Sequence, residues 1–306
     1  MTYKRKVTFL SALVAVLALI YTLILIFDRE RRRDYVFAWL DPGLTVMADR
    51  IEITGYGGFI ALNRRNNIWV FDAGDMEFPV RQSRVEDLFA LLSRRAVYPL
   101  RATSPEAAER LLLTEDAAHR IVVRGGIGLP LLDLLVGGGD VLGREVFLRM
   151  AGRNQIHSGE GDFTFFTSLM PTAWYDLRLF RPFNIDVVQQ ADIGLPDGEA
   201  FTLRRSGAGW VMQGNENVSL DALRVEAWLR SVIEVQGDDF APNAPEYADG
   251  IIILRLGDGS TRVLEAGQIS DEGEWLAVVS GSSLVYVLSD WNFDRIFPAI
   301  SHFIRD

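Results

Sequence analysis

The chain has 306 residues, enough for two ordinary domains, and its 49% hydrophobic and 24% charged residues exclude disorder over any large part. Its formal net charge of −10 disfavours nucleic acid as a partner, because an acidic body repels phosphate backbones. Cysteine is absent, which excludes disulfides, thiolate catalysis and cysteine-bound metals.

An apolar segment near the start predicts a membrane anchor. Residues 7–27 are uncharged, rich in Leu, Val, Ala and Ile, and flanked by charges, and about 20 such residues span a bilayer. Residues 4–6 also resemble the n-region of a signal peptide, but no small-x-small cleavage site ends the run. We therefore expect residues 1–34 to form an anchor, with a transmembrane helix at 7–27 and a charged collar, before a linker at 35–43. Bases lie on both sides of the span, so charge alone leaves its orientation open.

A Trp-bearing strand followed by an amphipathic helix opens the first folded unit. Alternating apolar residues predict a hairpin over residues 51–63 and a third strand over 68–71, which contains Trp69. The next segment contains Arg84, Val85 and Glu86, and its apolar residues recur at the spacing of one helix face. Such a stripe is typical of a helix that packs on a core.

Glycine-punctuated strands complete this unit. A short helix is expected to start at Ser104-Pro105-Glu106, because Pro and an acid are favoured in the first turn. Strands are then expected at residues 120–124, 131–136 and 145–151. The glycines between them match no phosphate-loop spacing, so turns between strands explain them better.

The same order of segments recurs in the second half of the chain. The recurring positions are Trp69, Arg84, Val85 and Glu86 in the first copy, Trp210, Arg224, Val225 and Glu226 in the second, and two closing motifs made of Trp174, Asp176 and Arg178 and of Trp291, Asp294 and Arg295. We interpret the acid and base of each closing motif as an ion pair or cap that fixes the chain end to its sheet.

These patterns predict an α+β fold class, in which an N-terminal transmembrane helix precedes two tandem repeats. The first repeat is expected at residues 44–181 and the second at 182–306. Each repeat is expected to be a mostly antiparallel sheet with one main helix packed on it.

No catalytic, cofactor or metal site is expected. The histidines lie far apart in the sequence and lack metal-ligand neighbours: His119, His157 and His302. No Gly-x-Ser-x-Gly motif is present, and the acids at 238–239 and 271–274 follow no EF-hand pattern. We therefore predict that the protein is not an enzyme.

With these features located, the chain resembles the DUF4340 family of membrane-anchored bacterial envelope proteins. Members of that family are often encoded beside ABC-transporter permease and ATPase subunits, including gliding-type systems. The resemblance implies a non-enzymatic accessory or scaffold subunit of an ABC-type transport or envelope-assembly system, with permease, ATPase or other envelope proteins as partners. It also implies a place at the bacterial inner membrane, with the N-terminus cytoplasmic and the body periplasmic. It carries over no active-site residues.

An alternative function is an extracytoplasmic module that binds glycan or peptide in the cleft between the two repeats. Exposed aromatic residues would be its platforms, and the candidates are Trp39, Tyr98 and Tyr247. Scattered aromatic residues are more often core or singly exposed. An enzyme is the weakest alternative, because no acid–base pair or nucleophile can be placed.

Overall fold

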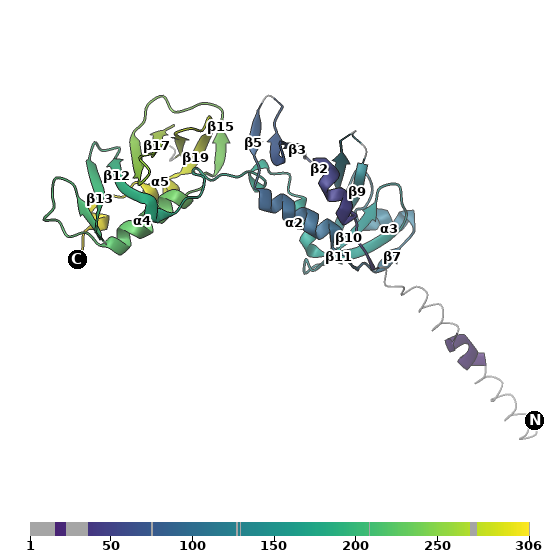
Figure 1. Ribbon diagram of the computed structural model, residues 1–306. Helices are drawn as coiled ribbons and strands as arrows, with labels where there is room; N and C mark the ends of the chain where they lie inside the picture. Colours follow the sequence, from purple (N-terminus) through teal and green to yellow (C-terminus); the bar gives the residue numbers. More distant parts are fainter. Residues whose placement is uncertain are drawn as a thin grey trace, which may run out of the picture. The chain divides into compact units, whose positions relative to one another are not determined.

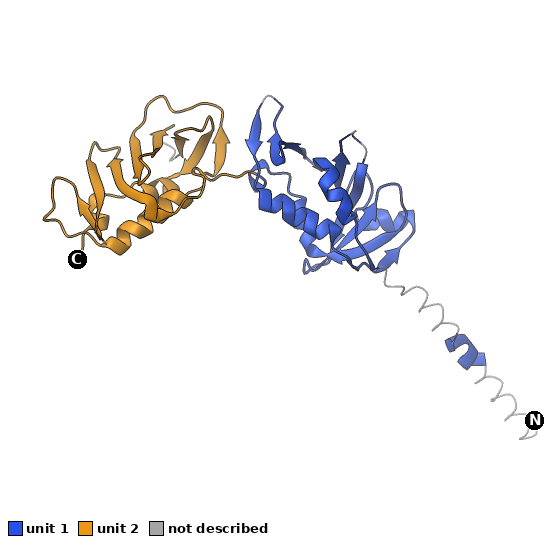
Figure 2. Cartoon of the chain, in the orientation of Figure 1, with its two compact units in different colours: residues 1–174 blue, residues 175–306 orange. Residues whose placement is uncertain are grey.

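The computed structural model describes residues 16–22, 36–74, 76–126, 128, 130–207, 209–269 and 274–305. The chain divides into two units, Met1–Trp174 and Tyr175–Asp306, which Figure 2 shows in blue and orange. Each unit has its own sheet and its own main helix (Figure 1). The boundary between the units falls inside the segment that we expected to close the first repeat.

The predicted transmembrane helix at residues 7–27 is not found. Among the residues that the structure describes, no helix is long and apolar enough to cross a membrane. Residues 16–22 are helical. The rest of the predicted span, 7–15 and 23–27, lies outside the described residues. The predicted single-pass anchor is therefore not borne out by the part of the chain that the structure describes.

Unit 1 is built on an antiparallel sheet with the strand order β5-β4-β3-β2-β8-β9-β10-β11-β7. Its strands are β2 (Ala48–Gly55), β3 (Gly58–Arg65), β4 (Ile68–Asp72), β5 (Glu77–Pro79), β7 (Leu100–Ala102), β8 (His119–Gly125), β9 (Pro130–Gly139), β10 (Glu145–Met150) and β11 (Ile156–Glu160). Alternation along β2 places Ile51 and Ile53 in the core, whereas Arg50 and Glu52 project from the opposite face.

Helix α2 (Gln82–Ser93) packs its apolar stripe into the core of unit 1 (Figure 1). Its buried residues are Val85, Leu88, Leu91 and Leu92. Phe89, which we expected in the same stripe, is half-buried and lies with its ring centroid 5.8 Å from that of Trp69. The helix is thus fixed against the Trp-bearing strand.

A smaller core forms around the short helix α3 (Pro105–Arg110). Ala107 and Ala108 of this helix pack with Leu135 of β9 and Ile156 of β11. The hydroxyl of Ser104 accepts the Ala107 N–H at 3.3 Å and caps the helix start.

The residues that we expected to be a linker belong to unit 1. Strand β1 (Val36–Phe37) pairs antiparallel with β6 (Ala96–Val97) in a separate two-stranded sheet. Trp39 and Leu40 are only 7% and 1% exposed. The 3-10 helices η1 (Pro42–Met47), η2 (Gly161–Phe166) and η3 (Pro171–Ala173) complete the unit.

Unit 2 is also built on an antiparallel sheet, with the strand order β14-β13-β12-β16-β17-β18-β19-β15. Its strands are β12 (Val188–Gly194), β13 (Ala200–Ser206), β14 (Gly209–Met212), β15 (Asp239–Ala241), β16 (Gly250–Leu256), β17 (Thr261–Gln268), β18 (Glu274–Val279) and β19 (Val285–Ser289). Its helices are α4 (Ala222–Glu234), α5 (Asp290–Ile296), η4 (Ile185–Val187) and η5 (Ile300–Phe303).

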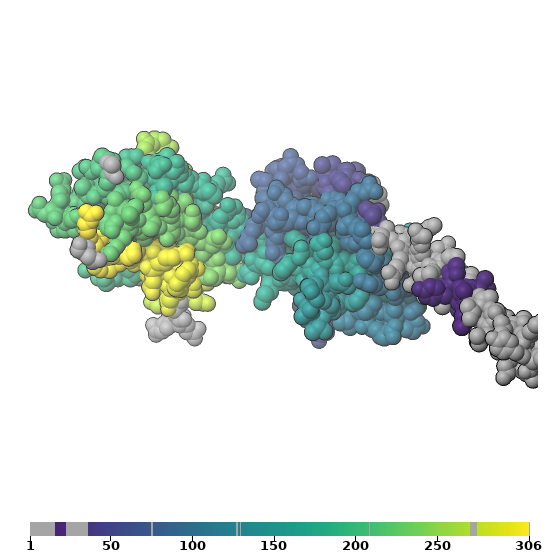
Figure 3. All heavy atoms as spheres, turned by 90° about the horizontal axis from the view of Figure 1, so that it is seen from below, coloured from purple at the N-terminus to yellow at the C-terminus, as the bar shows by residue number. Residues whose placement is uncertain are grey.

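Helix α4 and the C-terminal segment pack together in unit 2. The stripe expected on the helix is buried and consists of Val225, Trp228, Leu229 and Val232. The indole N–H of Trp228 donates to the Ile296 carbonyl at 2.9 Å. Figure 3 shows the C-terminal segment in yellow on the surface of this unit.

The two sheets share one strand order. From β4 to β7, the order β4-β3-β2-β8-β9-β10-β11-β7 corresponds strand for strand to that of unit 2, and each main helix follows the Trp-bearing strand. Unit 1 adds β5 at one edge.

The predicted α+β class is wrong, because the chain is mostly β. The described residues form three sheets, and strands make up 42% of the structure against 25% helix. Part of the strand content was missed because edge strands such as β5 and β15 have only three residues. Three residues are too few to show an alternating pattern in the sequence.

Candidate functional site

The Trp strand of unit 1 is tied to the start of α2 by one side chain. The Gln82 carboxamide accepts the Trp69 N–H at 2.9 Å and donates to the Trp69 carbonyl at 2.9 Å and to the Val80 carbonyl at 2.7 Å. In unit 2, Trp210 occupies the matching place on β14, and the Arg205 guanidinium lies 4.8 Å from its ring centroid. Both tryptophans are buried.

Arg84 is held by aromatic rings and a carbonyl. Its guanidinium lies 4.7 Å from the ring centroid of Trp174 and 5.4 Å from that of Phe166, and it donates to the Phe165 carbonyl. Burial, followed by the charge of Arg81, lowers the pKa of Arg84, and Asp87 opposes this shift. Arg84 therefore clamps the end of unit 1 to its helix. Val85 next to it is buried and Glu86 is exposed.

Arg224 plays a similar part in unit 2. It donates to the Ile304 carbonyl at 3.2 Å and pairs with Asp221 at 3.7 Å. Val225 is buried, whereas Glu226 is half-buried. In both units the recurring arginine thus reaches a main-chain carbonyl near the end of the unit.

The first closing motif is divided between the units. Trp174 is 0% exposed and its carbonyl accepts the Arg81 N–H at 2.9 Å in unit 1. Asp176 and Arg178 belong to unit 2 and pair at 2.7 Å, while Arg178 bridges antiparallel to Gln236. The main chain at 177–179 therefore opens unit 2 in the way that β1 opens unit 1.

The second closing motif has a different environment. Trp291 is 67% exposed in the first turn of α5, and the Arg295 guanidinium lies 4.6 Å from its ring centroid. Asp294 is also exposed. Phe303, not Trp291, matches Trp174, because its carbonyl accepts the N–H of Asp221, the residue before α4, at 2.8 Å.

No metal-binding cluster is found among the described residues. No group of three or more His, Asp or Glu residues there is placed to hold a metal ion. Asp238 is engaged structurally, since it accepts the Ser289 N–H at 2.8 Å and the Asn292 amide at 3.2 Å. Of the acids at 271–274, only Glu274 lies within the described residues.

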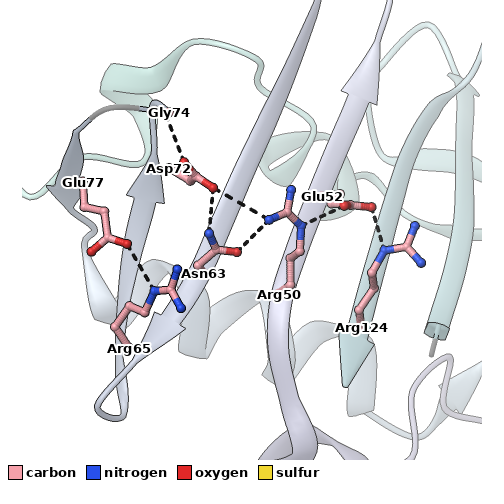
Figure 4. A network of polar contacts seen from close by, with 8 residues as sticks. All are labelled: Arg50, Glu52, Asn63, Arg65, Asp72, Gly74, Glu77 and Arg124. Atoms are coloured by element: carbon pink, nitrogen blue, oxygen red, sulfur yellow. Dashed lines mark hydrogen bonds and ion pairs between the residues drawn. The ribbon is translucent and has the colours of Figure 1, made fainter. Parts of the chain in front are cut away.

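A row of ion pairs crosses the outer face of the first sheet (Figure 4). Glu52 on β2 accepts from Arg50 at 2.8 Å and from Arg124 on β8 at 2.9 Å. Partial burial raises the pKa of Glu52, but these two arginines leave it below its usual value. The same cross-strand pair recurs in unit 2 between Asp192 and Arg255 at 3.0 Å. Because these groups satisfy one another, the row stabilises the sheets.

A groove lies beside α2 in unit 1. This helix groove has a volume of about 350 Å³ and is lined by α2, Arg94 and η2, with side chains from Asp87, Ala90, Leu91, Arg94, Asp162, Phe165 and Phe166. Arg94 is already paired with Glu160. Phe165 is 66% exposed, so the groove offers an apolar ring, and the carboxylates of Asp87 and Asp162 belong to the same lining.

A second hollow, which we call the aromatic pocket, has a volume of about 410 Å³. It is lined by Phe37, Ala38, Trp39, Met150, Arg153, Gln155 and His157. The Nδ1 atom of His157 lies 2.8 Å from the Tyr98 carbonyl, which requires that nitrogen to carry the proton. The pocket thus combines an aromatic wall with a polar rim.

The three proposed aromatic platforms have different environments. Trp39 and Tyr98 are 7% and 2% exposed, with ring centroids 5.2 Å apart, whereas Tyr247 is 74% exposed. Trp39 lines the aromatic pocket from within the core. The sequence singled out neither Arg153 nor Phe165, because a lone arginine in a turn carries no pattern and Phe165 is one of three phenylalanines in residues 163–166.

Comparison with known proteins identifies one family. Residues 69–251 match the family described as "Domain of unknown function (DUF4340)". No curated protein and no solved structure matches the chain. The matched region covers more than half of the chain and spans parts of both units. The chain therefore belongs to the DUF4340 family.

Proposed function

We propose that this protein is a non-enzymatic accessory or scaffold subunit of an ABC-type transport or envelope-assembly system. Family membership supports this function, since DUF4340 members are often encoded beside permease and ATPase subunits. Those subunits are the proposed partners. The folded body acts on the extracytoplasmic side, so a C-terminal alkaline phosphatase fusion is expected to be active, and a stable but inactive fusion would contradict this placement.

We infer that the two units arose by duplication. Their sheets share one strand order, and each main helix follows the Trp-bearing strand. In each unit the residue before that helix donates its N–H to the main-chain carbonyl of a buried aromatic residue near the end of the unit. That residue is Trp174 in unit 1 and Phe303 in unit 2. Positions that repeat in this way serve the fold.

The observation that carries the proposed function is the contrast between the exposed faces of α2 and α4. Three buried positions match, since Val85, Leu88 and Leu92 of α2 correspond to Val225, Trp228 and Val232 of α4. On the exposed faces, however, Asp87 corresponds to Ala227 and Ala90 to Arg230. Asp87 and Ala90 both line the helix groove. A surface that differs between two copies of one fold is free to serve a partner, so the helix groove is the proposed docking site.

The chemistry of the helix groove defines the partner segment. Asp87, Asp162 and the exposed ring of Phe165 all line the groove. Carboxylates beside an apolar ring are complementary to a segment that carries Arg or Lys next to an apolar side chain. The partner is therefore expected to present a basic, amphipathic segment.

Co-purification tests this function. The full-length protein is tagged, co-expressed with the ABC-type permease and ATPase subunits proposed as its partners, and purified in mild detergent. Both subunits are expected to elute with it in fixed ratio. Elution of the protein alone, while the permease and ATPase still elute with each other, would contradict the proposal.

A further inference from the structure

We propose that the aromatic pocket of unit 1 binds a small amphiphile with an apolar or aromatic body and one anionic head group. This inference goes beyond the scaffold function and does not depend on it. The pocket lies at β1, the end of β10 and the start of β11, whereas the helix groove lies at α2 and η2. The two sites can therefore be tested separately.

The wall of the pocket is suited to a flat apolar body. Phe37 meets Trp39 edge-on with ring centroids 4.9 Å apart, and meets His157 edge-on at 5.2 Å. Met150 adds an adaptable thioether on the same lining. Edge-to-face contacts of this kind hold the rings in place before a ligand arrives, which reduces the entropy lost on binding.

The size of the pocket fits a small organic molecule. Its volume of about 410 Å³ falls within the range of roughly 300–1,000 Å³ that is usual for ligand pockets. A phenyl ring with a short aliphatic chain can be enclosed there, with the head group left at the rim.

Charge selects the head group. Arg153 is the charged residue of the lining, and no carboxylate lines the pocket among the described residues. This is unusual in a chain whose formal net charge is −10. The main-chain N–H of Arg153 donates to the Met150 carbonyl, and its carbonyl accepts from the Arg149 guanidinium. Its own guanidinium is exposed and can contact an anionic head group. Gln155 adds a carboxamide at the same rim.

Unit 2 places its own aromatic ring at the corresponding position. His157 of β11 pairs with Leu100 of β7, whereas its counterpart Tyr286 of β19 pairs with Phe240 of β15. The Phe240 ring covers Tyr286 at 5.2 Å, and Tyr175 lies 4.9 Å from Phe240. Unit 2 thus packs tilted aromatic rings at this position, whereas unit 1 has Leu100 there and an adjoining pocket.

Calorimetric titration of the full-length protein with a matched pair of compounds tests the proposal. The compounds are 4-phenylbutyrate and 4-phenylbutan-1-ol, which share a body and differ in the head group. The carboxylate compound is expected to bind roughly fivefold to tenfold more tightly than the alcohol, because one charge-assisted hydrogen bond at a solvated rim contributes about that much affinity. Arg153→Gln is expected to remove this preference, and Gln155→Glu to weaken binding of the anion at least as much.

The control is Arg110→Gln, which removes an exposed arginine of the same unit away from the pocket. All three variants alter exposed side chains, so folding is expected to be unchanged. Failure of both compounds to bind would overturn the proposal. Equal affinity for the two compounds, or a preference that survives Arg153→Gln and Gln155→Glu, would overturn it as well.

Discussion

Trp174 fixes the C-terminal end of unit 1 to the start of its main helix. Its ring is fully buried, its carbonyl receives the N–H before α2, and Arg84 lies over its face. Matching residue letters paired it with Trp291, but the hydrogen bond to the helix start identifies Phe303 as its counterpart. Letter matching failed because α5 has no equivalent of the same length in unit 1, so identical residues fall at different places.

Alanine substitution distinguishes the two tryptophans. Trp174→Ala is expected to destabilise unit 1 by about 3–5 kcal/mol, because a buried aromatic ring is replaced by a cavity. Trp291→Ala is expected to cost at most about 1 kcal/mol, the value of an exposed cation–π contact. Urea unfolding followed by circular dichroism measures both. Equal losses for the two variants would refute the assigned environments.

At the scale of elements, the two main helices begin differently. In α4, Asp221 caps the helix by accepting the N–H groups of Leu223 at 2.9 Å and Arg224 at 3.3 Å. In α2, Arg81 provides no side-chain cap, and Gln82 instead ties the first turn to Trp69. One fold thus fixes the same junction by two sets of bonds.

Gln82→Ala is expected to destabilise unit 1 by about 1–3 kcal/mol, because both main-chain groups of Trp69 lose their partner at a partly buried position. Asp221→Ala is expected to destabilise unit 2 by about 1 kcal/mol through loss of the cap. Ser83→Ala, an exposed change one residue along α2, is the control and should have little effect. Thermal melting measures all three. A Gln82 variant as stable as the control would contradict the role of this clamp.

Long elements were predictable from the sequence, and short ones were not. The hairpin, the Trp strand, α2 and the strands at β8 to β10 lie where alternation and helical spacing placed them. Strands β1 and β6 have two residues each, too few for a pattern, and they exist because they pair with each other. The candidate pockets are still less predictable, because Arg153 and Gln155 become neighbours of Phe37 only through this pairing and the β10–β11 turn.

At the scale of the whole molecule, the unit boundary lies before residue 175 and not after 181. The N–H of Leu179 donates to Val235 at 3.2 Å, and the N–H of Gly237 donates to Leu177 at 2.8 Å. Leu179 and Phe180 are 4% and 3% exposed in the core of unit 2. The short segment that we expected to close the first repeat is therefore the beginning of unit 2.

Two fragments test this boundary. Residues 175–306 are expected to unfold cooperatively. Residues 182–306 lose two main-chain bonds and the buried side chains of Tyr175, Leu177, Leu179 and Phe180. The shorter fragment should be less stable by several kcal/mol, on the order of 2–5 per large core side chain removed, or fail to fold. Chemical denaturation of both fragments under the same conditions measures the difference. Equal stability would place the boundary after residue 181 instead.

We propose that repeated positions hold the fold, while the helix groove of unit 1 receives the partner. The most direct test exchanges the differing residues between the helices and measures co-purification with the permease and ATPase subunits. Asp87→Ala with Ala90→Arg gives α2 the exposed residues of α4 and is expected to reduce recovery of the subunits at least tenfold, with unchanged melting. Ala227→Asp with Arg230→Ala makes the reverse change in unit 2 and should leave recovery intact. Full recovery with the α2 variant, or equal loss with both, would contradict the account.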